Sequence, residues 1–372
     1  MTFAPTADHR DEIARSLDDR IARYITGAPD EAAFERLVRE LFAYQYERNA
    51  PYRTFCDRVG RRPADVAGWR DVPPVSAASF SDARLACFPP ERSALMFVSS
   101  GTTSSGHASR HELDATALYS TSLEEHYRAM VLPDAAGMRH VFFAPPFTEA
   151  PQSSLSFMLF AIEARFGSPD SGFYLRGDAL DLDGLARALR SDEACVVFGT
   201  AFAFVHFFDR CREDGARYRL AHGSRVVETG GFKGKSREVA RDVLYGWFEE
   251  FLAVPRSMCV SEYGMCELCS QWYDANIADA IQNRARRDQV KIGPHWTRTM
   301  IVDPVTADEV AAGAPGLLRI FDLSNRGSVA AVLTGDLARA RDGGIEIIGR
   351  HPGALPKGCS ISADTVLSAT DS

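Results

Sequence analysis

The sequence predicts an α/β protein in which parallel sheets are layered with helices, followed by a smaller antiparallel, barrel-like subdomain. Short apolar runs recur between residues 95 and 263, and each run ends in small or polar residues. Helical patterns lie between several of these runs, and such strand–helix alternation is typical of parallel sheets. From about Lys291 onward, short strands are separated by Gly, Asp and Pro, which indicates antiparallel pairing.

Shifts in composition divide the 372 residues into three expected segments. Residues 1–90 hold helical patterns, clearest at residues 31–49, that would pack on the core. A stretch rich in Pro and Ser, residues 68–84, leads into an α/β core expected at residues 91–290. The β-rich subdomain is expected at residues 291–372 and includes the segment around Cys359.

The charge and composition exclude several classes of protein. The chain has 42 lysines and arginines against 50 aspartates and glutamates, a net charge of −8, which argues against a nucleic-acid-binding face. The first twenty residues are too charged for a signal peptide, and the longest apolar region, residues 196–208, is too short to cross a bilayer. We therefore expect a cytoplasmic protein without a membrane partner. Its eight scattered cysteines indicate buried or reactive thiols rather than disulfides.

The segment SSGTTSSG, Ser99–Gly106, is the first candidate for binding phosphate. It follows an apolar run, and glycines with small hydroxyl side chains allow backbone N–H groups to wrap a polyphosphate. The alternative is a polar surface loop, because runs of Ser, Thr and Gly are common in loops.

A second glycine-rich segment, TGGFKGKS at residues 229–236, competes for this role. A P-loop needs four residues between its first glycine and its Gly-Lys pair, whereas only three separate Gly230 from Gly234. The segment is therefore one residue too short for the usual phosphate loop. Gly230 and Gly231 would instead allow a purine ring to lie flat against the backbone.

Three charged residues farther along the chain suit a nucleotide and its metal. Glu267 offers carboxylate oxygens, which Mg²⁺ prefers as ligands. Asp336 has two acceptor oxygens for the two ribose hydroxyls, and Arg350 would reach a phosphate or the ribose. The alternatives are a carboxylate in a first helical turn for Glu267, a turn residue for Asp336 and a surface charge for Arg350.

In this order, these residues resemble the adenylate-forming superfamily. The resemblance is closer to its acyl-protein synthetase family, typified by the synthetase component of bacterial bioluminescence fatty-acid reductase. It extends over about residues 95–365 and implies the fold of the superfamily's N-terminal domain. The segments that carry it are SSGTTSSGHASR, APPFTEAPQSSLSFML, ETGGFKGKSRE, SEYGMCELCSQWYD, IFDLSNRGSVAAVLTGDL and EIIGRHPGALPKGCSISADT.

The resemblance implies that ATP and a carboxylic acid form an acyl-adenylate and pyrophosphate with Mg²⁺, and that the acyl group then moves to a thiol. Ser99–Thr103 would hold the pyrophosphate portion, and residues 230–232 would border the adenine with Tyr263 nearby. Glu267 would bind Mg²⁺, and Glu267 and Arg350 would be catalytic. The implied ATP-binding residues are Ser99, Ser100, Gly101, Thr102, Thr103, Gly230, Gly231, Phe232, Tyr263, Gly264, Cys266 and Asp336.

The sequence departs from the superfamily pattern at several places. Cys266 stands where the superfamily has a threonine, which puts in doubt the contact that the threonine hydroxyl would make with phosphate. The lysine that is common in the first loop of the superfamily is also missing, and Arg110 is the nearest cation. The sequence given ends twenty-two residues after Arg350, without the superfamily's usual C-terminal domain and its lysine. Acyl-protein synthetases share this feature and carry an acyl-accepting cysteine near the C-terminus. Cys359 is at the matching place, where Lys357 would favour its thiolate.

Three functions follow from these observations. The first is acyl transfer from the adenylate to a thiol, on Cys359 or on a partner or carrier protein. The second is an amide- or ester-forming ligase in which an amine or alcohol takes the acyl group directly. The third is a non-catalytic subunit that binds a partner such as an acyl reductase, which Cys266 favours and the retained Glu267, Asp336 and Arg350 oppose. The pair Cys266 and Cys269 is half of a zinc or redox signature, and two small buried side chains are the simpler expectation.

Overall fold

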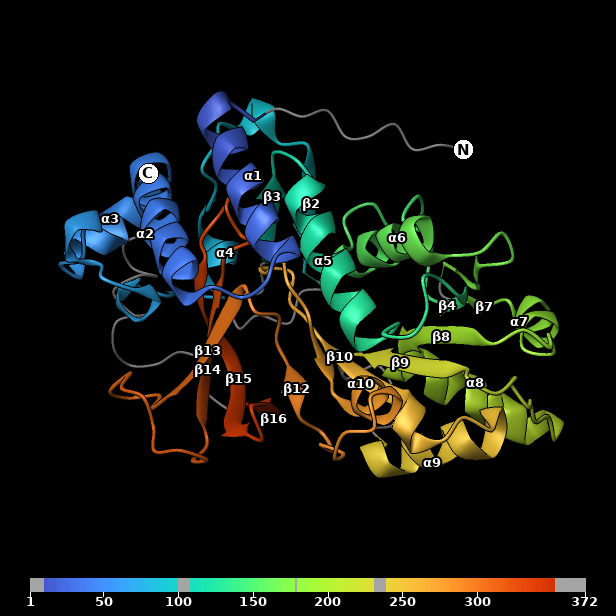
Figure 1. Cartoon of the computed structure of the whole chain (residues 1–372). Coiled ribbons are helices and arrows are strands. Elements are labelled where there is room, and N and C mark those ends of the chain that lie inside the picture. Colours follow the sequence, from blue (N-terminus) through green and yellow to red (C-terminus); the bar gives the residue numbers. More distant parts are fainter. Residues whose placement is uncertain (1–9, 100–107, 178, 231–238, 352–372) are drawn as a thin grey trace. The chain divides into compact units, whose positions relative to one another are not determined.

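The computed structural model describes residues 10–99, 108–177, 179–230 and 239–351 (Figure 1). The contacts between residues divide the chain into two compact units. Unit 1 takes its described residues from 1–125, 265–270 and 293–372, and unit 2 from 126–264 and 271–292. The helical N-terminal segment and the β-rich C-terminal segment expected from the sequence thus both contribute to unit 1.

Unit 1 begins with helices whose first turns are capped by aspartates. Asp11 accepts a hydrogen bond from the Ala14 backbone N–H, and Asp30 accepts one from Ala33, which satisfies donors that a helix start leaves unpaired. The helices are α1 (Glu12–Thr26), α2 (Glu31–Arg48), α3 (Ala50–Arg58), α4 (Ser79–Asp82) and α5 (Ala117–Met130), the last of which ends in unit 2. Short 3₁₀ turns lie at Pro63–Asp65, Trp69–Asp71 and Pro90–Arg92.

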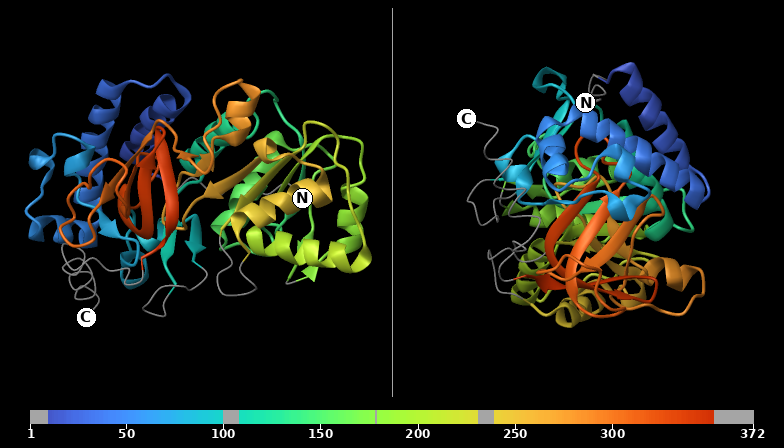
Figure 2. Two further views of the ribbon diagram at one scale, coloured as in Figure 1. Left: turned by 90° about the horizontal axis from the view of Figure 1, so that it is seen from below. Right: turned by 90° about the vertical axis from the view of Figure 1, so that its left-hand side faces the viewer.

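The antiparallel pairing expected in the C-terminal part is confirmed. Four strands follow one another in the order β13-β14-β15-β16, each antiparallel to the next, and β1 (Val75–Ser76) joins β15 in parallel (Figure 2). The strands are β13 (Thr297–Val302), β14 (Gly316–Asp322), β15 (Ala331–Arg341) and β16 (Gly344–Arg350). A two-residue turn, Asp342 and Gly343, joins β15 to β16 and sets their register.

The strand before the serine-rich segment pairs differently from the expectation. The apolar run at residues 95–98 is a strand, β2 (Leu95–Val98), but it pairs antiparallel with β3 (Arg110–Leu113) rather than lying in a parallel sheet. The serine-rich segment therefore connects two strands, not a strand and a helix. The cause is the short connection, because a parallel crossover needs a dozen or more residues, usually with a helix.

Unit 2 is built on a mostly parallel sheet in the order β12-β11-β10-β9-β8-β4-β5. The strands from β10 to β5 are parallel, and β11 and β12 are antiparallel to their neighbours. These strands are β4 (Arg139–Phe143), β5 (Gly172–Phe173), β8 (Cys195–Thr200), β9 (Arg225–Thr229), β10 (Cys259–Tyr263), β11 (Trp272–Asp274) and β12 (Lys291–Ile292). A separate pair consists of β6 (Leu175–Arg176) and β7 (Ala179–Leu180).

Helices cover both faces of this sheet, which accounts for its continuous apolar strands. In Figure 1, α8 and α9 lie along one face and α6 lies on the other. Aromatic rings join α8 to α9, with the ring centres of Phe204 and Phe248 4.9 Å apart. The helices of unit 2 are α6 (Ser154–Phe166), α7 (Leu182–Ala188), α8 (Ala201–Asp214), α9 (Arg241–Leu252) and α10 (Asn276–Ile281).

Because β8, β9 and β10 are parallel neighbours, their carboxyl ends share one edge of the sheet.

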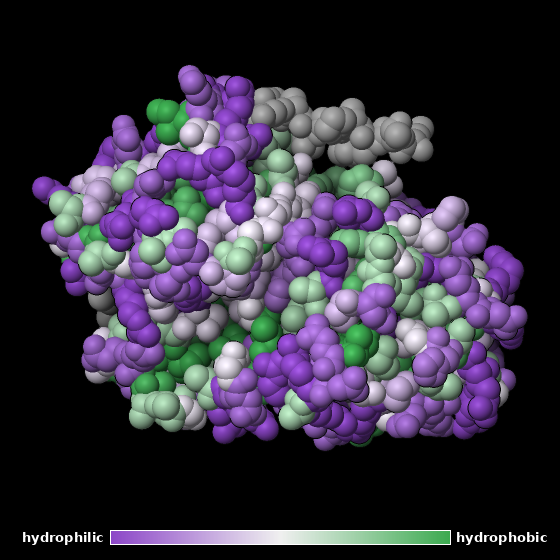
Figure 3. All heavy atoms as spheres, viewed as in Figure 1, coloured by the Kyte–Doolittle hydropathy of each residue, from purple (hydrophilic) through white to green (hydrophobic). Residues whose placement is uncertain are grey.

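The surface shows no large apolar patch on the face drawn in Figure 3, where hydrophobic residues are scattered among hydrophilic ones. Among the described residues, the exposed large hydrophobic side chains come from different elements and loops: Ile13, Leu182, Val243, Val305 and Ile348. Within the same residues, we find no helix with the length and apolar character needed to span a membrane.

Candidate functional site

The predicted site residues divide between the two units. Unit 1 contains Ser99, Cys266, Glu267, Asp336 and Arg350. Unit 2 contains Gly230, Tyr263 and Gly264. The remaining predicted residues lie outside the described part of the chain: Ser100, Gly101, Thr102, Thr103, Gly231, Phe232 and Cys359.

Unit 1 brings the three charged site residues together. Asp336 of β15 is in register with Arg350 of β16, and Arg350 Nε lies 3.4 Å from Asp336 Oδ1. Glu267 is only 6% exposed, and burial raises the pKa of its carboxyl, while Arg350 lowers it and Asp336 raises it further. The cluster thus combines two carboxylates with one exposed guanidinium, which suits a ligand with hydroxyls, phosphates and a metal ion.

Ser99 is connected to this cluster through Ser109. The Ser99 hydroxyl accepts a hydrogen bond of 2.9 Å from the Ser109 backbone N–H, and the Ser99 N–H donates to the Ser109 carbonyl. The Ser109 side chain is buried close enough to Glu267 to lower the pKa of its carboxyl, although Ser109 Oγ makes no hydrogen bond with a described residue. The residue that opens the serine-rich segment therefore lies in the same part of unit 1 as the proposed metal ligand.

The backbone that carries Glu267 is held by two residues that the sequence analysis missed. Glu267 lies in a turn, Met265–Leu268, and not in the helix considered as an alternative. His111 Nδ1 contacts the Cys266 carbonyl at 2.8 Å, and Asn325 Nδ2 donates to the Glu267 carbonyl at 2.9 Å. His111 Nε2 also contacts Asn325 Oδ1. These contacts fix the turn from both sides.

Replacing Asn325 with alanine is expected to weaken the site through this turn. Without the Asn325 amide, the Glu267 and Val329 carbonyls lose a donor each, so the Glu267 carboxylate is held less firmly. We expect the Mg²⁺ concentration for half-maximal ATP–pyrophosphate exchange to rise about tenfold, as for other residues that orient a ligand indirectly. A titration with Mg²⁺ measures this; a lower yield of folded protein with an unchanged Mg²⁺ requirement would contradict it.

In unit 2, the predicted residues end two adjacent strands. Gly230 follows β9 with a φ of 68°, a conformation that other residues rarely adopt. Tyr263 ends β10, and its ring centre lies 6.2 Å from that of the buried Trp272. These positions place Gly230, Tyr263 and Gly264 at the edge of a parallel sheet where ligands usually bind.

The same strand ends carry buried polar residues that the sequence analysis did not select. Thr229 Oγ1 donates a hydrogen bond to Glu262 Oε2, and both residues are less than 10% exposed. Glu228 is also buried, and burial raises the pKa of its carboxyl. A charged residue inside an otherwise apolar run, as in RVVET and CVSEY, is the sequence signal that could have identified them.

The pKa of Glu262 leads to a prediction about stability. Burial raises it from 4.5 to about 7, with Thr229 and Lys291 lowering it and Glu228 raising it. The folded protein therefore loses stability as the pH rises from about 5 through 7, because the buried carboxyl must ionise. Glu262→Gln has no carboxyl to ionise, so it avoids this loss. The free energy of unfolding of the variant minus that of wild type should therefore increase by up to about 3 kcal/mol between about pH 5 and pH 8.

Urea unfolding at several pH values measures this difference. Glu250→Gln, which removes an exposed carboxylate paired with Arg217 in the same unit, is the control and should show no such gain. A constant difference between Glu262→Gln and wild type across the pH range would contradict the prediction.

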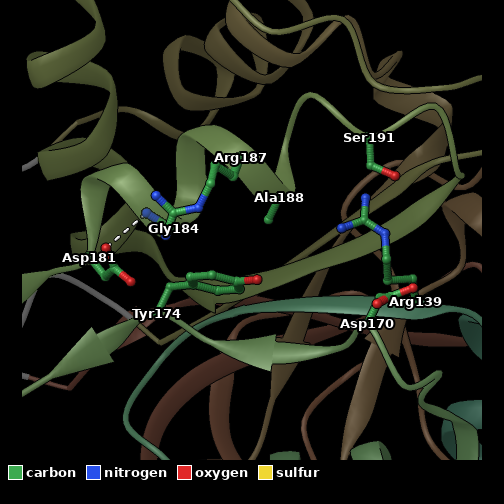
Figure 4. Close-up of a pocket in the computed structure, with 8 residues that line it drawn as sticks. All are labelled: Arg139, Asp170, Tyr174, Asp181, Gly184, Arg187, Ala188 and Ser191. Carbon is green, nitrogen blue, oxygen red and sulfur yellow. Dashed lines mark hydrogen bonds between the residues drawn. The ribbon is translucent and has the colours of Figure 1, made fainter.

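A separate hollow of about 350 Å³ lies in unit 2 beside α7. Figure 4 shows Arg139, Arg187 and Tyr174 around it, with Asp181 accepting a hydrogen bond from the Gly184 N–H at 2.8 Å. None of the predicted site residues lines it. Its place at the beginning of β4, rather than at the carboxyl ends of the strands, separates it from the candidate site.

The residues around Glu267 fit a magnesium ion that takes most of its ligands from elsewhere. Within the described residues, no group of three or more His, Cys, Asp or Glu side chains is arranged to hold a metal ion. Mg²⁺ at nucleotide sites is usually bound through one or two carboxylates, waters and the phosphates. A single buried carboxylate is consistent with that mode. Neither Cys266, which is partly exposed, nor Cys269, which is buried, forms a disulfide with a described residue.

Comparison with known proteins gives related ligases, although no family model matches the chain. The long-chain-fatty-acid–luciferin-component ligase of Aliivibrio fischeri is 21% identical over 374 residues, which cover 91% of this chain and 92% of that protein. A structure of 2-hydroxyisobutyryl-CoA ligase with 2-HIB-AMP has a TM-score of 0.64 at 16% identity, covering 88% of this chain and 70% of that one. The luciferase-like enzyme of the mealworm Zophobas morio has a TM-score of 0.50 at 16% identity, covering 69% and 57%.

These likenesses confirm three predictions. The structural neighbours confirm the fold class, and the Aliivibrio relative confirms the resemblance along nearly the whole chain. The predicted class of enzyme, an adenylate-forming ligase, agrees with both. The roles of the individual site residues stay predictions.

Proposed function

We propose that this chain is a ligase of the adenylate-forming superfamily, which activates a carboxylic acid with ATP and transfers the acyl group to a thiol. The observation that carries the proposal is the convergence of Glu267, Asp336 and Arg350 in unit 1. Their types match the parts of a nucleotide: oxygen ligands for a metal, paired acceptors for ribose hydroxyls and a cation for phosphate.

In the first half-reaction, a carboxylate oxygen of the acid attacks the α-phosphorus of ATP, and pyrophosphate leaves with the electrons of the broken P–O bond. Asp336 would accept hydrogen bonds from the ribose, and Arg350 would pair with phosphate. Glu267 would hold Mg²⁺, which neutralises phosphate charge as pyrophosphate leaves. Ser99, together with Ser100–Thr103, would bind the departing pyrophosphate. Gly230, Gly231, Phe232, Tyr263 and Gly264 would border the adenine.

In the second half-reaction, a thiolate sulfur attacks the acyl carbonyl carbon, and AMP leaves with the acyl-phosphate oxygen. We assign this thiol to Cys359, which lies outside the described residues, or to a partner protein that receives the acyl group afterwards. The sequence context supports Cys359, because Gly358 allows close approach and Lys357 favours the thiolate. The name of the Aliivibrio relative joins a long-chain fatty acid to a luciferin component, which supports a carboxylic acid as the substrate.

Two measurements test the proposal. ATP–pyrophosphate exchange with a panel of fatty, aryl and amino acids should occur with at least one acid, and no exchange with any of them would favour a non-catalytic, partner-binding role. Intact mass spectrometry after incubation with ATP, Mg²⁺ and that acid should show one added acyl group. Cys359→Ala should lose the added mass while keeping exchange. Product formation on an amine or alcohol that survives Cys359→Ala would favour direct transfer instead.

A further inference from the structure

The carboxyl ends of β9 and β10 hold a carboxylate whose charge the neighbouring residues leave unbalanced. Glu262 of β10 is in register with Thr229 of β9, and the Thr229 hydroxyl donates to Glu262 Oε2. The Glu262 side chain is buried, with the residue 5% exposed. Among the described residues, no Lys, Arg or His forms an ion pair with it; the charges it senses are those of Lys291 and Glu228.

The nearby cations belong to the other face of the sheet. Glu228 precedes Thr229 on β9, so its side chain points to the face opposite that of Thr229 and Glu262. Asp274 is in register with Lys291 and binds both Lys291 Nζ, at 3.0 Å, and the Arg241 guanidinium. On that face, the two cations Lys291 and Arg241 therefore balance the charges of the two carboxylates, Glu228 and Asp274. Within the described part of the chain, the hydrogen-bond partner of the Glu262 carboxyl is the Thr229 hydroxyl.

A second buried acceptor without a donor among the described residues belongs to Gln271, whose side chain, like that of Glu262, borders Gly264. Gln271 is 4% exposed, and its buried Oε1 receives no hydrogen bond from any described residue. A Cβ at Gly264 would lie 2.5 Å from Glu262 Oε1 and 3.6 Å from Gln271 Cγ, so both side chains converge on this glycine. A buried acceptor without a donor destabilises the folded protein, and a hydrogen bond from a ligand would offset that cost.

These acceptors adjoin the residues proposed to border the nucleotide. Thr229 directly precedes Gly230, and the Glu262 carboxyl borders Gly264, so both lie at the strand ends that carry these glycines. The Tyr263 side chain follows Glu262 on β10 and points to the opposite face of the sheet. Ligands of open parallel sheets bind at the carboxyl ends of the strands. The acid must place its own carboxylate at the α-phosphate of ATP, so the rest of the acid lies beside the nucleotide.

We propose that Glu262 and Gln271 bind an ammonium group of the acid substrate, so that the enzyme selects carboxylic acids that carry an amine. An ammonium has three donors and one positive charge, which would satisfy both acceptors and balance Glu262. An unsubstituted alkyl acid would leave both acceptors unpaired. This inference rests on the proposed function, whose first half-reaction supplies its assay.

The test is ATP–pyrophosphate exchange by the full chain with matched sets of acids that differ in one substituent: an amine, a hydroxyl or a methyl group on the same carbon skeleton. For at least one skeleton, the amine-bearing acid should have a KM at least about tenfold below that of its methyl counterpart, as expected when a charged hydrogen bond is lost. Equal KM values, or preference for the hydroxyl or methyl member in every set, would overturn the proposal.

Two variants test whether Glu262 and Gln271 cause the preference for amine-bearing acids. Glu262→Gln keeps the size of the side chain and removes its charge, so the ratio of the KM for the amine-bearing acid to the KM for the methyl acid should rise at least about tenfold. Gln271→Met, a second variant of similar volume, should raise the same ratio about threefold to tenfold. Glu163→Gln, a half-buried carboxylate on α6, is the control and should leave the preference unchanged.

The outcomes separate this inference from the proposed function. Absence of exchange with every acid would contradict the proposed function itself. Exchange confined to acids without an amine, or an amine preference that persists in both Glu262→Gln and Gln271→Met, would overturn the inference alone. Should Glu262→Gln fail to fold, Gln271→Met alone decides.

Discussion

Glu267→Gln is expected to lower the rate of ATP–pyrophosphate exchange at least about 100-fold, the size of effect seen when one group that stabilises transition-state charge is removed. Glutamine keeps the volume of the side chain but replaces one carboxylate oxygen with an amide and removes the charge. The loss should appear in the chemical step, because the metal that Glu267 would hold neutralises phosphate charge as pyrophosphate departs.

Stability gives this variant a distinctive signature. Burial raises the pKa of Glu267, so the folded protein resists ionising it, and the neutral glutamine should leave the free energy of unfolding equal or higher near neutral pH. Glu346→Gln, on the same strand as Arg350, is the matched control and should keep full exchange. A Glu267→Gln protein with exchange within a few-fold of wild type would contradict the assigned role.

Arg326→Ala is expected to cause the largest loss of stability, about 3–5 kcal/mol in the free energy of unfolding, because it removes the cation that two buried carboxylates share. Asp18 would keep its ion pair with Arg10, and Asp114 would lose both of its hydrogen bonds from Arg326. Arg326 is 3% exposed and donates from Nε and Nη2 to Asp18 of α1, and from Nη1 and Nη2 to Asp114. The four distances lie between 2.6 and 3.0 Å. This network joins the N-terminal helices to the β-rich part of unit 1.

Urea unfolding of the variants measures the effect. Adding Asp18→Asn and Asp114→Asn to the Arg326 variant should recover part of the loss, because the uncompensated charges are removed. Arg210→Ala, which breaks exposed pairs with Glu213 and Asp214, should cost less than about 1 kcal/mol. A loss below that value in Arg326→Ala would show that the buried network contributes little.

The sequence was most informative where local pattern determines structure. The apolar runs at β4, β8, β9 and β10 are continuous because both faces of the sheet are covered, and they were recognisable without knowledge of the fold. The pairing of β2 was not, because its apolar run looks the same in a parallel and an antiparallel sheet. Only the short connection to β3 distinguishes the two.

The candidate site likewise contains residues that a local sequence pattern identifies and residues that it does not. Glu267, Asp336 and Arg350 were predicted because each stands in a short motif with its own spacing. His111 and Asn325 were missed because their partners are set by the topology; His111 lies 155 residues from Cys266 and 214 from Asn325. Gln271 was missed for a different reason: its significance comes from a buried oxygen without a donor, which no sequence pattern records.

A crystal structure of the full chain grown with Mg²⁺ and a non-hydrolysable ATP analogue tests the central claim most directly. The account predicts one nucleotide with its ribose hydroxyls on Asp336, its phosphates beside Ser99 and Arg350, its metal ion on Glu267 and its adenine against Gly230 and Tyr263. A nucleotide bound elsewhere, for example in the hollow beside α7, with these residues out of its reach, would contradict the account.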